Sequence, residues 1–178
     1  MTDYLQRVNE DDELIVIDTV RQEIRDGYCY YGGHLFLAVA NDASANAYLK
    51  TGSEYIKYKF FVDSTQTIDI YFYEGAVIDT SGNSLPLLNF NRNISSSFGA
   101  TAYHTPVIDT SGNVIGFRRV FATSTILAKG GSTAAEGEFG RILKPNTNYL
   151  MQIYNRSGSA TADIQLNIRI CNLAGYVT

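Results

Sequence analysis

The residues that most suggest chemistry are two aspartates, each of which begins the same short motif. Asp79-Thr80-Ser81-Gly82 recurs as Asp109-Thr110-Ser111-Gly112, inside a heptapeptide repeated letter for letter at 77–83 and 107–113. Acid proteases bring two Asp-Thr-Gly loops together so that their carboxylates share a proton. Here a serine separates each glycine from its Asp-Thr pair, and Asp, Ser, Gly and Asn are common turn residues. The motif therefore predicts one strand-to-turn geometry used twice, and not an active site.

Other residue types that catalyse reactions or bind metals are too few or too poorly spaced to form a site. Histidine occurs twice, as His34 and His104, so a catalytic triad or a histidine-rich metal site has little to draw on. The consecutive acids Glu10 to Glu13 cannot converge like the alternating ligands of a calcium loop. Gly130-Gly131-Ser132 lacks the residues that complete a phosphate cradle. We therefore expect no enzyme activity, no metal site and no cofactor.

The two cysteines, Cys29 and Cys171, are far apart in the sequence and fit no paired metal-ligand spacing. The segment Met1 to Glu13 is polar and acidic, and it contains no apolar stretch typical of a secretory signal. The apolar run from Leu35 to Ala40 is far too short to span a bilayer. We therefore expect synthesis and folding in a reducing cytoplasm, with no membrane partner. In that compartment both cysteines should be free thiols.

Tyrosine is abundant, with 13 residues in the chain. Six of these offer more aromatic surface than one core face would bury: Tyr28, Tyr30, Tyr31, Tyr55, Tyr71 and Tyr73. Tyrosine suits protein interfaces because its ring is large and rigid and its tip is polar. A platform that stacks on sugars is the rival use of the same rings. At least half of them are expected to serve sheet packing alone.

Strand-like alternation is clearest near the end of the chain. From Asp163 to Ile170 polar and apolar residues alternate, as in a strand with one face on a core. Thr147 to Asn155 reads as a second strand, and the small polar loop between the two predicts a hairpin. Residues 54–74 predict another hairpin, in which Phe61 interrupts the polar face and leaves the register open.

Length and composition favour one all-β domain. The chain has 178 residues, of which 45% are hydrophobic and 18% charged, and this composition suits a folded globular domain. A strand from His34 to Ala40 and a loop from Asn41 to Ala47 continue the pattern of short strands and turns. No stretch has the apolar spacing of a long helix. We predict an antiparallel two-sheet sandwich, jelly-roll-like, with an immunoglobulin-like sandwich as the second choice.

The predicted domain spans residues 14–178 and follows an N-terminal arm at residues 1–13. The arm is too polar to gain much by packing on its own domain, so it is expected to stay solvated or to dock on a partner. A formal charge of −4 and a pI near 5.1 argue against nucleic acid as a partner.

Four patches of the sequence follow one another in a distinctive order. They are Glu23 to Gly27, Tyr73 to Gly75, Asn91 to Asn93 and Arg141 to Leu150, of which the last is the most specific. Together they resemble a family of tailed-bacteriophage virion proteins that is similar to jelly-roll head decoration, or cement, proteins. The resemblance covers about residues 15 to 170.

The resemblance implies a homo-oligomer, with a trimer favoured, that sits on the capsid exterior of the virion. Its partner would be the major capsid protein, and its function would be to bind and stabilise the assembled capsid. The rival interpretation is a receptor- or glycan-binding module of a tail fibre or spike. The residues expected at the interface are Tyr28, Tyr30, Tyr31, Asn91, Arg92 and Asn93.

Overall fold

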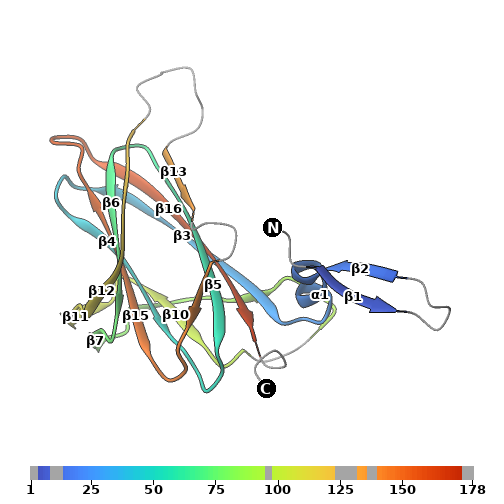
Figure 1. Cartoon of the computed structure of the whole chain (residues 1–178). Helices are drawn as coiled ribbons and strands as arrows, with labels where there is room; N and C mark the ends of the chain where they lie inside the picture. Colours follow the sequence, from blue (N-terminus) through green and yellow to red (C-terminus); the bar gives the residue numbers. More distant parts are fainter. Residues whose placement is uncertain (1–3, 9–13, 95–97, 123–131, 136–139, 174–178) are drawn as a thin grey trace.

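The chain folds as a jelly roll of two antiparallel sheets (Figure 1). The computed structural model describes residues 4–8, 14–94, 98–122, 132–135 and 140–173. Eight of the strands in these residues build the two layers: β3 (Cys29–Val39), β4 (Ser44–Lys50), β5 (Ile56–Ser64), β6 (Ile68–Glu74), β12 (Asn113–Val120), β13 (Ser132–Ala135), β15 (Asn148–Asn155) and β16 (Ala162–Asn172). We call β13-β5-β16-β3 the front sheet and β12-β6-β15-β4 the back sheet.

The strand order identifies the topology. Along the chain, the first of these eight strands pairs with the eighth, the second with the seventh, the third with the sixth and the fourth with the fifth. Pairing of this kind makes one long hairpin out of all eight strands. When that hairpin is rolled up, it gains the pairs β5–β16 and β6–β15, both of which are present. This arrangement is a jelly roll. The predicted all-β, jelly-roll-like sandwich is therefore confirmed.

The sequence predicted two hairpins, and both predictions are wrong. Strands β5 and β6 lie in opposite sheets, and so do β15 and β16, so the loops that join them cross the sandwich. Alternation detects a strand but does not specify its partner, which depends on the rest of the sheet. Asn155 holds one of the crossings, because its side-chain amide donates to the carbonyls of Val39 and Ala160. The loop expected from Asn41 to Ala47 is shorter, since β4 begins at Ser44 and buries Ala45 in the core.

The core lies between the central strands of the two sheets. The alternation seen in β16 has the predicted result, since Ile164, Leu166, Ile168 and Ile170 are buried in it. Strand β15 supplies the facing side chains Tyr149, Met151 and Ile153. The polar residues of β16 point to the other side of the front sheet, where Asp163 is exposed and Gln165, Asn167 and Arg169 are half-buried.

Residues between β6 and β12 form an insertion that wraps the sandwich. The chain leaves β6 as β7 (Val77–Thr80), adds β8 (Asn83–Leu85) to the far edge of the back sheet, and then adds β9 (Leu88–Asn89) to the front sheet beside β3. It returns through β10 (Thr101–His104), which lies between β8 and β4, and continues as β11 (Val107–Thr110) into β12. By linking an edge of each sheet, the insertion closes one side of the core.

The repeated heptapeptide forms β7 and β11, which pair with each other as a two-stranded ribbon. Ile78 of one copy pairs with Ile108 of the other, with an irregularity on either side, so the copies are related by an approximate twofold axis. Ser111 Oγ donates to Gln152 Oε1 on the outward side of β15 (3.2 Å). The ribbon therefore covers part of the outer face of the back sheet, outside β15 in Figure 1. Both copies end at a glycine with a left-handed backbone, since Gly82 and Gly112 have φ values of 80° and 85°. Neither copy forms the expected hairpin, because the strands that follow pair elsewhere, β8 with β10 and β12 with β6.

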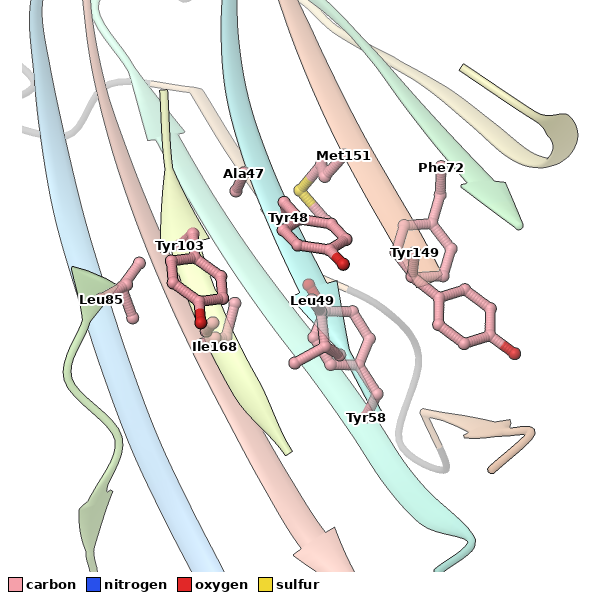
Figure 2. A pocket seen from close by; sticks show the side chains of 11 residues that line it. Ala47, Tyr48, Leu49, Tyr58, Phe72, Leu85, Tyr103, Tyr149, Met151 and Ile168 are labelled. Atoms are coloured by element: carbon pink, nitrogen blue, oxygen red, sulfur yellow. The ribbon is translucent and has the colours of Figure 1, made fainter. Parts of the chain in front are cut away.

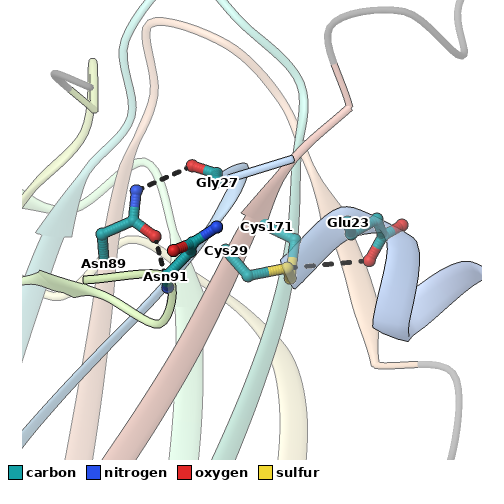
Figure 3. The surroundings of a disulfide bond; sticks show 6 residues. All are labelled: Glu23, Gly27, Cys29, Asn89, Asn91 and Cys171. Carbon is teal, nitrogen blue, oxygen red and sulfur yellow. Dashed lines mark hydrogen bonds between the residues drawn. A yellow bond between two sulfur atoms is a disulfide. The ribbon is translucent and has the colours of Figure 1, made fainter. Parts of the chain in front are cut away.

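The expectation of two free thiols is wrong, because Cys29 and Cys171 form a disulfide (Figure 3). They are 142 residues apart in sequence but directly opposite on β3 and β16, with Cα atoms 4.1 Å apart. The flanking bond from Asn172 N to Tyr28 O makes this a non-hydrogen-bonded pair, the closer of the two antiparallel pair types. The compartment argument could not foresee that strand pairing would bring the sulfurs together.

The start of the chain adds a helix and a hairpin to the front-sheet side. Strands β1 (Tyr4–Val8) and β2 (Leu14–Asp18) pair with each other, and α1 (Thr19–Arg25) follows directly. The hairpin projects away from the sandwich in Figure 1. Strand β1 thus falls within the predicted arm, and its partner β2 falls within the predicted domain. The acidic run Glu10 to Glu13 lies outside the described residues. In the part of the chain that is described, no helix is long and apolar enough to cross a membrane.

The ribbon gives a direct test of the fold. A Cβ atom at Gly112 would meet the carbonyl oxygen of Glu74, whereas one at Gly158, with a similar φ of 87°, would meet nothing within 4 Å. Gly158→Ala should cost about 1–2 kcal/mol from its left-handed backbone alone. Gly112→Ala should cost about 1–3 kcal/mol more because of the clash. Urea unfolding of both variants measures the difference, and equal losses would contradict the ribbon's close approach to β6.

Candidate functional site: the open face of the front sheet

The two outer faces of the sandwich differ in how they are covered. The insertion crosses the back sheet, whereas among the described residues α1 covers the front sheet only near the disulfide. The rest of the front sheet's outer face is the open face. Its side chains come from β3, β5, β9, β14 (Arg141–Leu143, which pairs with β5), β16 and the residue after β9: Tyr31, Leu35, Leu37, Lys57, Lys59, Phe61, Leu88, Phe90, Ile142, Gln165, Asn167 and Arg169.

Large apolar side chains are unusually frequent on the open face. Leu37 and Ile142, near its two long edges, are each 68% exposed, and Leu35 and Phe61 are 46% and 40% exposed between them. These side chains do not form one continuous apolar patch, because the outward residues of β16, between β3 and β5, are mostly polar: Asp163, Gln165, Asn167 and Arg169. A sheet face that mixes exposed apolar and polar side chains in this way has the composition of a non-obligate protein interface. One sequence signal for this face lies in the run from Leu35 to Ala40. Apolar and polar residues do not alternate there, as expected when both faces of a strand are apolar.

Charges on the open face are distributed unevenly. Lys59 pairs with Arg169 in register, and Lys57 lies two residues further along β5, so the end near the disulfide is basic. Asp63 and Asp163 lie at the opposite end, where Asp163 Oδ1 accepts from the backbone N–H of Ala38 (2.9 Å). A partner with a matching charge gradient would bind in one orientation, because charge complementarity sets register more than affinity.

Two of the three expected interface tyrosines are accessible near the basic end of the open face, whereas Tyr30 is in register with the core residue Ile170 and is buried. Tyr28 and Tyr31 are each 41% exposed, whereas Tyr30 is only 5% exposed and stacks on Phe98 (4.6 Å between ring centroids). The ring of Tyr31 lies 4.9 Å from that of Phe90, and the guanidinium of Arg169 lies 5.8 Å from the same Phe90 ring. An aromatic pair beside an arginine is a typical interface anchor.

The Asn-Arg-Asn patch lies at the same end, since β9 pairs with β3 at Tyr30 and Tyr31. Asn91 serves the fold: its Nδ2 donates to the carbonyl of Arg25 at the end of α1 (2.7 Å). Arg92 and Asn93 are exposed. The structure thus brings the two expected groups together and leaves Tyr28, Tyr31, Arg92 and Asn93 accessible.

The uncovered part of the back sheet carries a separate aromatic cluster. The ring of Tyr71 lies within 4.9–6.2 Å of the rings of Tyr73, Phe117 and Tyr154, measured between centroids. Asp69, which is 2% exposed, accepts two hydrogen bonds from Arg119 (2.6 and 2.7 Å) beside this cluster. These bonds hold the pKa of the Asp69 carboxyl below its usual range, against the opposing effect of burial.

The cavity shown in Figure 2 lies inside the sandwich and is too small for a ligand. This cavity measures about 10 Å³ and is lined by aromatic and aliphatic side chains that include Tyr58, Phe72, Tyr149 and Ile168. One water molecule needs about 10–15 Å³, so an organic ligand does not fit there. Asp79 and Asp109 are exposed on the ribbon, as turn residues usually are.

Comparisons with known proteins add little to this picture. No family model matches the chain, and no curated protein matches it. The chain is similar to one in the solved "Cyanophage Pam1 capsid asymmetric unit", at 15% identity and a TM-score of 0.31, over 80% of this chain and 82% of that one. It is also similar to a chain of the Israel acute paralysis virus pentamer, at 9% identity and a TM-score of 0.21, over 97% of this chain and 55% of that one. TM-scores of this size do not establish a shared fold, so the jelly roll is assigned from strand order alone.

The two histidines meet between the sheets, with ring centroids 3.6 Å apart. Desolvation, and then the charge of His104, lowers the pKa of His34 below its ordinary value of 6.5. In the unfolded chain, the side chain of His34 therefore binds a proton at a higher pH than it does in the folded chain. The contribution of neutral His34 to the free energy of unfolding is complete above about pH 6.5, and it is lost as the pH falls through the lowered pKa.

We expect a lower urea midpoint at pH 5 than at pH 7.5. Both pH values lie above the carboxylate range, so the histidines dominate the difference. His34→Gln should reduce this difference most, and His104→Gln should reduce it less, because burial of His34 remains. A wild-type midpoint that does not change between the two pH values would contradict the stacked pair.

Proposed function

We propose that this protein is a structural component of a tailed-bacteriophage virion, which binds the outer surface of the assembled capsid and stabilises it. The observation that carries the proposal is the open face, a sheet surface with several exposed large apolar side chains, on the same side of the sandwich as the projecting N-terminal hairpin. The four sequence patches that resemble decoration proteins support the same assignment. No step of this function requires a reaction.

The size of the open face suits a protein partner. Taken at their own lengths, with about 3.3 Å per residue and about 4.8 Å between neighbours, the five strands give an area of about 570 Å². A standard protein interface buries about 800 Å² on each partner, so the face would supply most of one specific contact. Its aromatic and arginine anchors at one end and apolar side chains along its length resemble the composition of interface cores.

The hairpin extends the contact beyond the sheet. Strands β1 and β2 pair with each other and not with either sheet, so within the described residues the hairpin is attached mainly through α1. Its position at the front-sheet side would let it reach a partner seated on the open face (Figure 1). This is the docking role considered for the N-terminal arm.

A homo-oligomer, most simply a trimer, is part of the proposal. Repeated copies bound to one lattice gain affinity together, by about a hundredfold or more when all can engage at once. Strand β12 supports this part, because it is an edge strand with exposed Val114, Ile115 and Phe117 and no proline or lysine to blunt pairing.

Glycan binding by a tail fibre or spike is the second candidate. The Tyr71 cluster favours it, because the exposed ring of Phe117 and the half-buried tyrosine rings beside it can stack on a sugar, to which the tyrosine hydroxyls can hydrogen-bond. This cluster lies on the back sheet, so variants of the two sheets separate the two functions.

Capsid binding should depend on the open face and not on the back sheet. Leu37→Glu and Ile142→Glu each place an unpaired charge in the proposed interface, so each should weaken binding to undecorated shells by about tenfold or more. Val107→Glu, which changes a 54% exposed side chain on the ribbon outside the back sheet, is the matched control and should bind normally. Co-sedimentation with shells measures all three. Normal binding by both open-face variants, with glycan-array binding that Phe117→Glu abolishes, would support the fibre or spike function instead.

The oligomer can be tested on the purified protein. Light scattering should give a multiple of the chain mass of 19.7 kDa, with three chains favoured. A protein that stays monomeric at micromolar concentration, both free and when eluted from shells, would rule out this part of the proposal.

A further inference from the structure

Three buried side chains from different elements converge under α1 (Figure 3). Glu23 comes from α1, Cys29 begins β3, and Cys171 lies near the end of β16. One ligand atom from each lies within 4.8 Å of the others, and the residues are 4%, 0% and 1% exposed. A carboxylate that faces two sulfurs in a buried site is a donor set that suits zinc.

Backbone hydrogen bonds hold these residues in place independently of the disulfide. Tyr28 N donates to the carbonyl of Glu23 (2.9 Å), and Asn89 Nδ2 donates to the carbonyl of Gly27 (2.9 Å), which fixes the turn between α1 and β3. Asn172 N donates to the carbonyl of Tyr28 and joins the strands beside the cysteines. The convergence should therefore persist when the disulfide is reduced.

The distance between the carboxylate and the sulfur supports a metal site. Glu23 Oε2 lies 3.8 Å from Cys29 Sγ. A disulfide sulfur carries no proton, so this sulfur can donate to Glu23 only as a thiol. In a tetrahedral zinc site, Zn–S and Zn–O bonds of about 2.3 and 2.0 Å put sulfur and oxygen about 3.5 Å apart, close to the distance found.

We propose that the reduced chain binds one Zn²⁺ ion, or a similar thiophilic divalent cation, through Cys29 Sγ, Cys171 Sγ and Glu23 Oε2. A cellular dithiol supplies the reduction: it transfers two electrons and two protons to the disulfide and becomes a disulfide itself. Each thiol then releases its proton as the metal binds, so one Zn²⁺ replaces two protons. With three protein ligands, water takes the fourth position.

The metal and the disulfide would be alternative states of the same two sulfurs. The disulfide joins β3 to β16, which are already paired in the front sheet. The metal would also join Glu23, and therefore α1, to both strands. It would fix the base of the projecting hairpin in a reducing compartment, where the disulfide is not maintained. The proposal depends only on this cluster, so it stands or falls separately from capsid binding.

Cobalt titration of the full chain tests the site, since Co²⁺ adopts the same geometry and reports thiolate ligands by a charge-transfer absorption. The chain is reduced without oxygen by a phosphine, which is then removed. We expect one Co²⁺ per reduced chain, displaced by Zn²⁺, and none in the disulfide form. Cys29→Ser should abolish the charge-transfer band. Glu23→Gln keeps both thiols and should weaken binding by about tenfold or more.

Asp109→Asn, which changes an exposed acid on the ribbon outside the back sheet, is the matched control and should bind as the wild type does. A reduced, folded chain with two titratable thiols and no charge-transfer band would overturn the proposal. Unchanged affinity in Glu23→Gln would remove Glu23 from the site. If the reduced chain unfolds, refolding upon addition of Zn²⁺ supports the site and failure to refold overturns it.

Discussion

Burial between β15 and β16 is the contact on which the rest of the structure depends. These strands are consecutive in the chain but central to opposite sheets, so that Met151 and Ile153 of one share the core with Ile164 and Leu166 of the other. Each buried side chain of this size contributes about 1.5–3 kcal/mol, and a one-residue slip of either strand would move its apolar set to the outside. Strands β5 and β3 flank β16 in the front sheet, and β6 and β4 flank β15 in the back sheet. This arrangement of neighbours around the two central strands is the jelly-roll winding.

The winding also explains why the two faces of the sandwich differ. Strands β6 and β12 are neighbours in the back sheet, so the insertion between them starts and ends at one edge of that sheet. It can reach the opposite side of the core only by crossing the back sheet, once in each direction, and the two crossings pair as the ribbon. The identical heptapeptides suit this arrangement, because antiparallel pairing of identical segments is self-complementary. Among the residues that the structure describes, the front sheet has no comparable cover, so most of its outer face is open there.

The sequence predicted the strands better than their partners. Alternation located β15 and β16, and composition indicated a sandwich, because both signals are local. Sheet assignment, the crossings and the Cys29–Cys171 pair depend on contacts between residues more than a hundred positions apart, which no local pattern contains. For the candidate site, the tyrosine and Asn-Arg-Asn groups were found separately and prove to be neighbours. Phe61 does interrupt a polar face, as the alternation indicated, since it pairs with Asn167 and lies between Lys59 and Asp63 on β5.

The most specific patch of the resemblance, Arg141 to Leu150, is a structural element. Thr51 Oγ1 donates to the carbonyl of Lys144, and Tyr149 donates to Glu74 while accepting from the backbone N–H of Lys144, so the turn into β15 is held from three directions. Burial raises the pKa of Tyr149 to about 12, which keeps this hydroxyl protonated as a donor at all physiological pH values. Such a patch can persist between proteins because it secures the central strand, whatever the outer faces bind. Partner choice must then reside in residues that the fold does not require, and Leu37, Ile142 and Phe61 on the open face are of that kind.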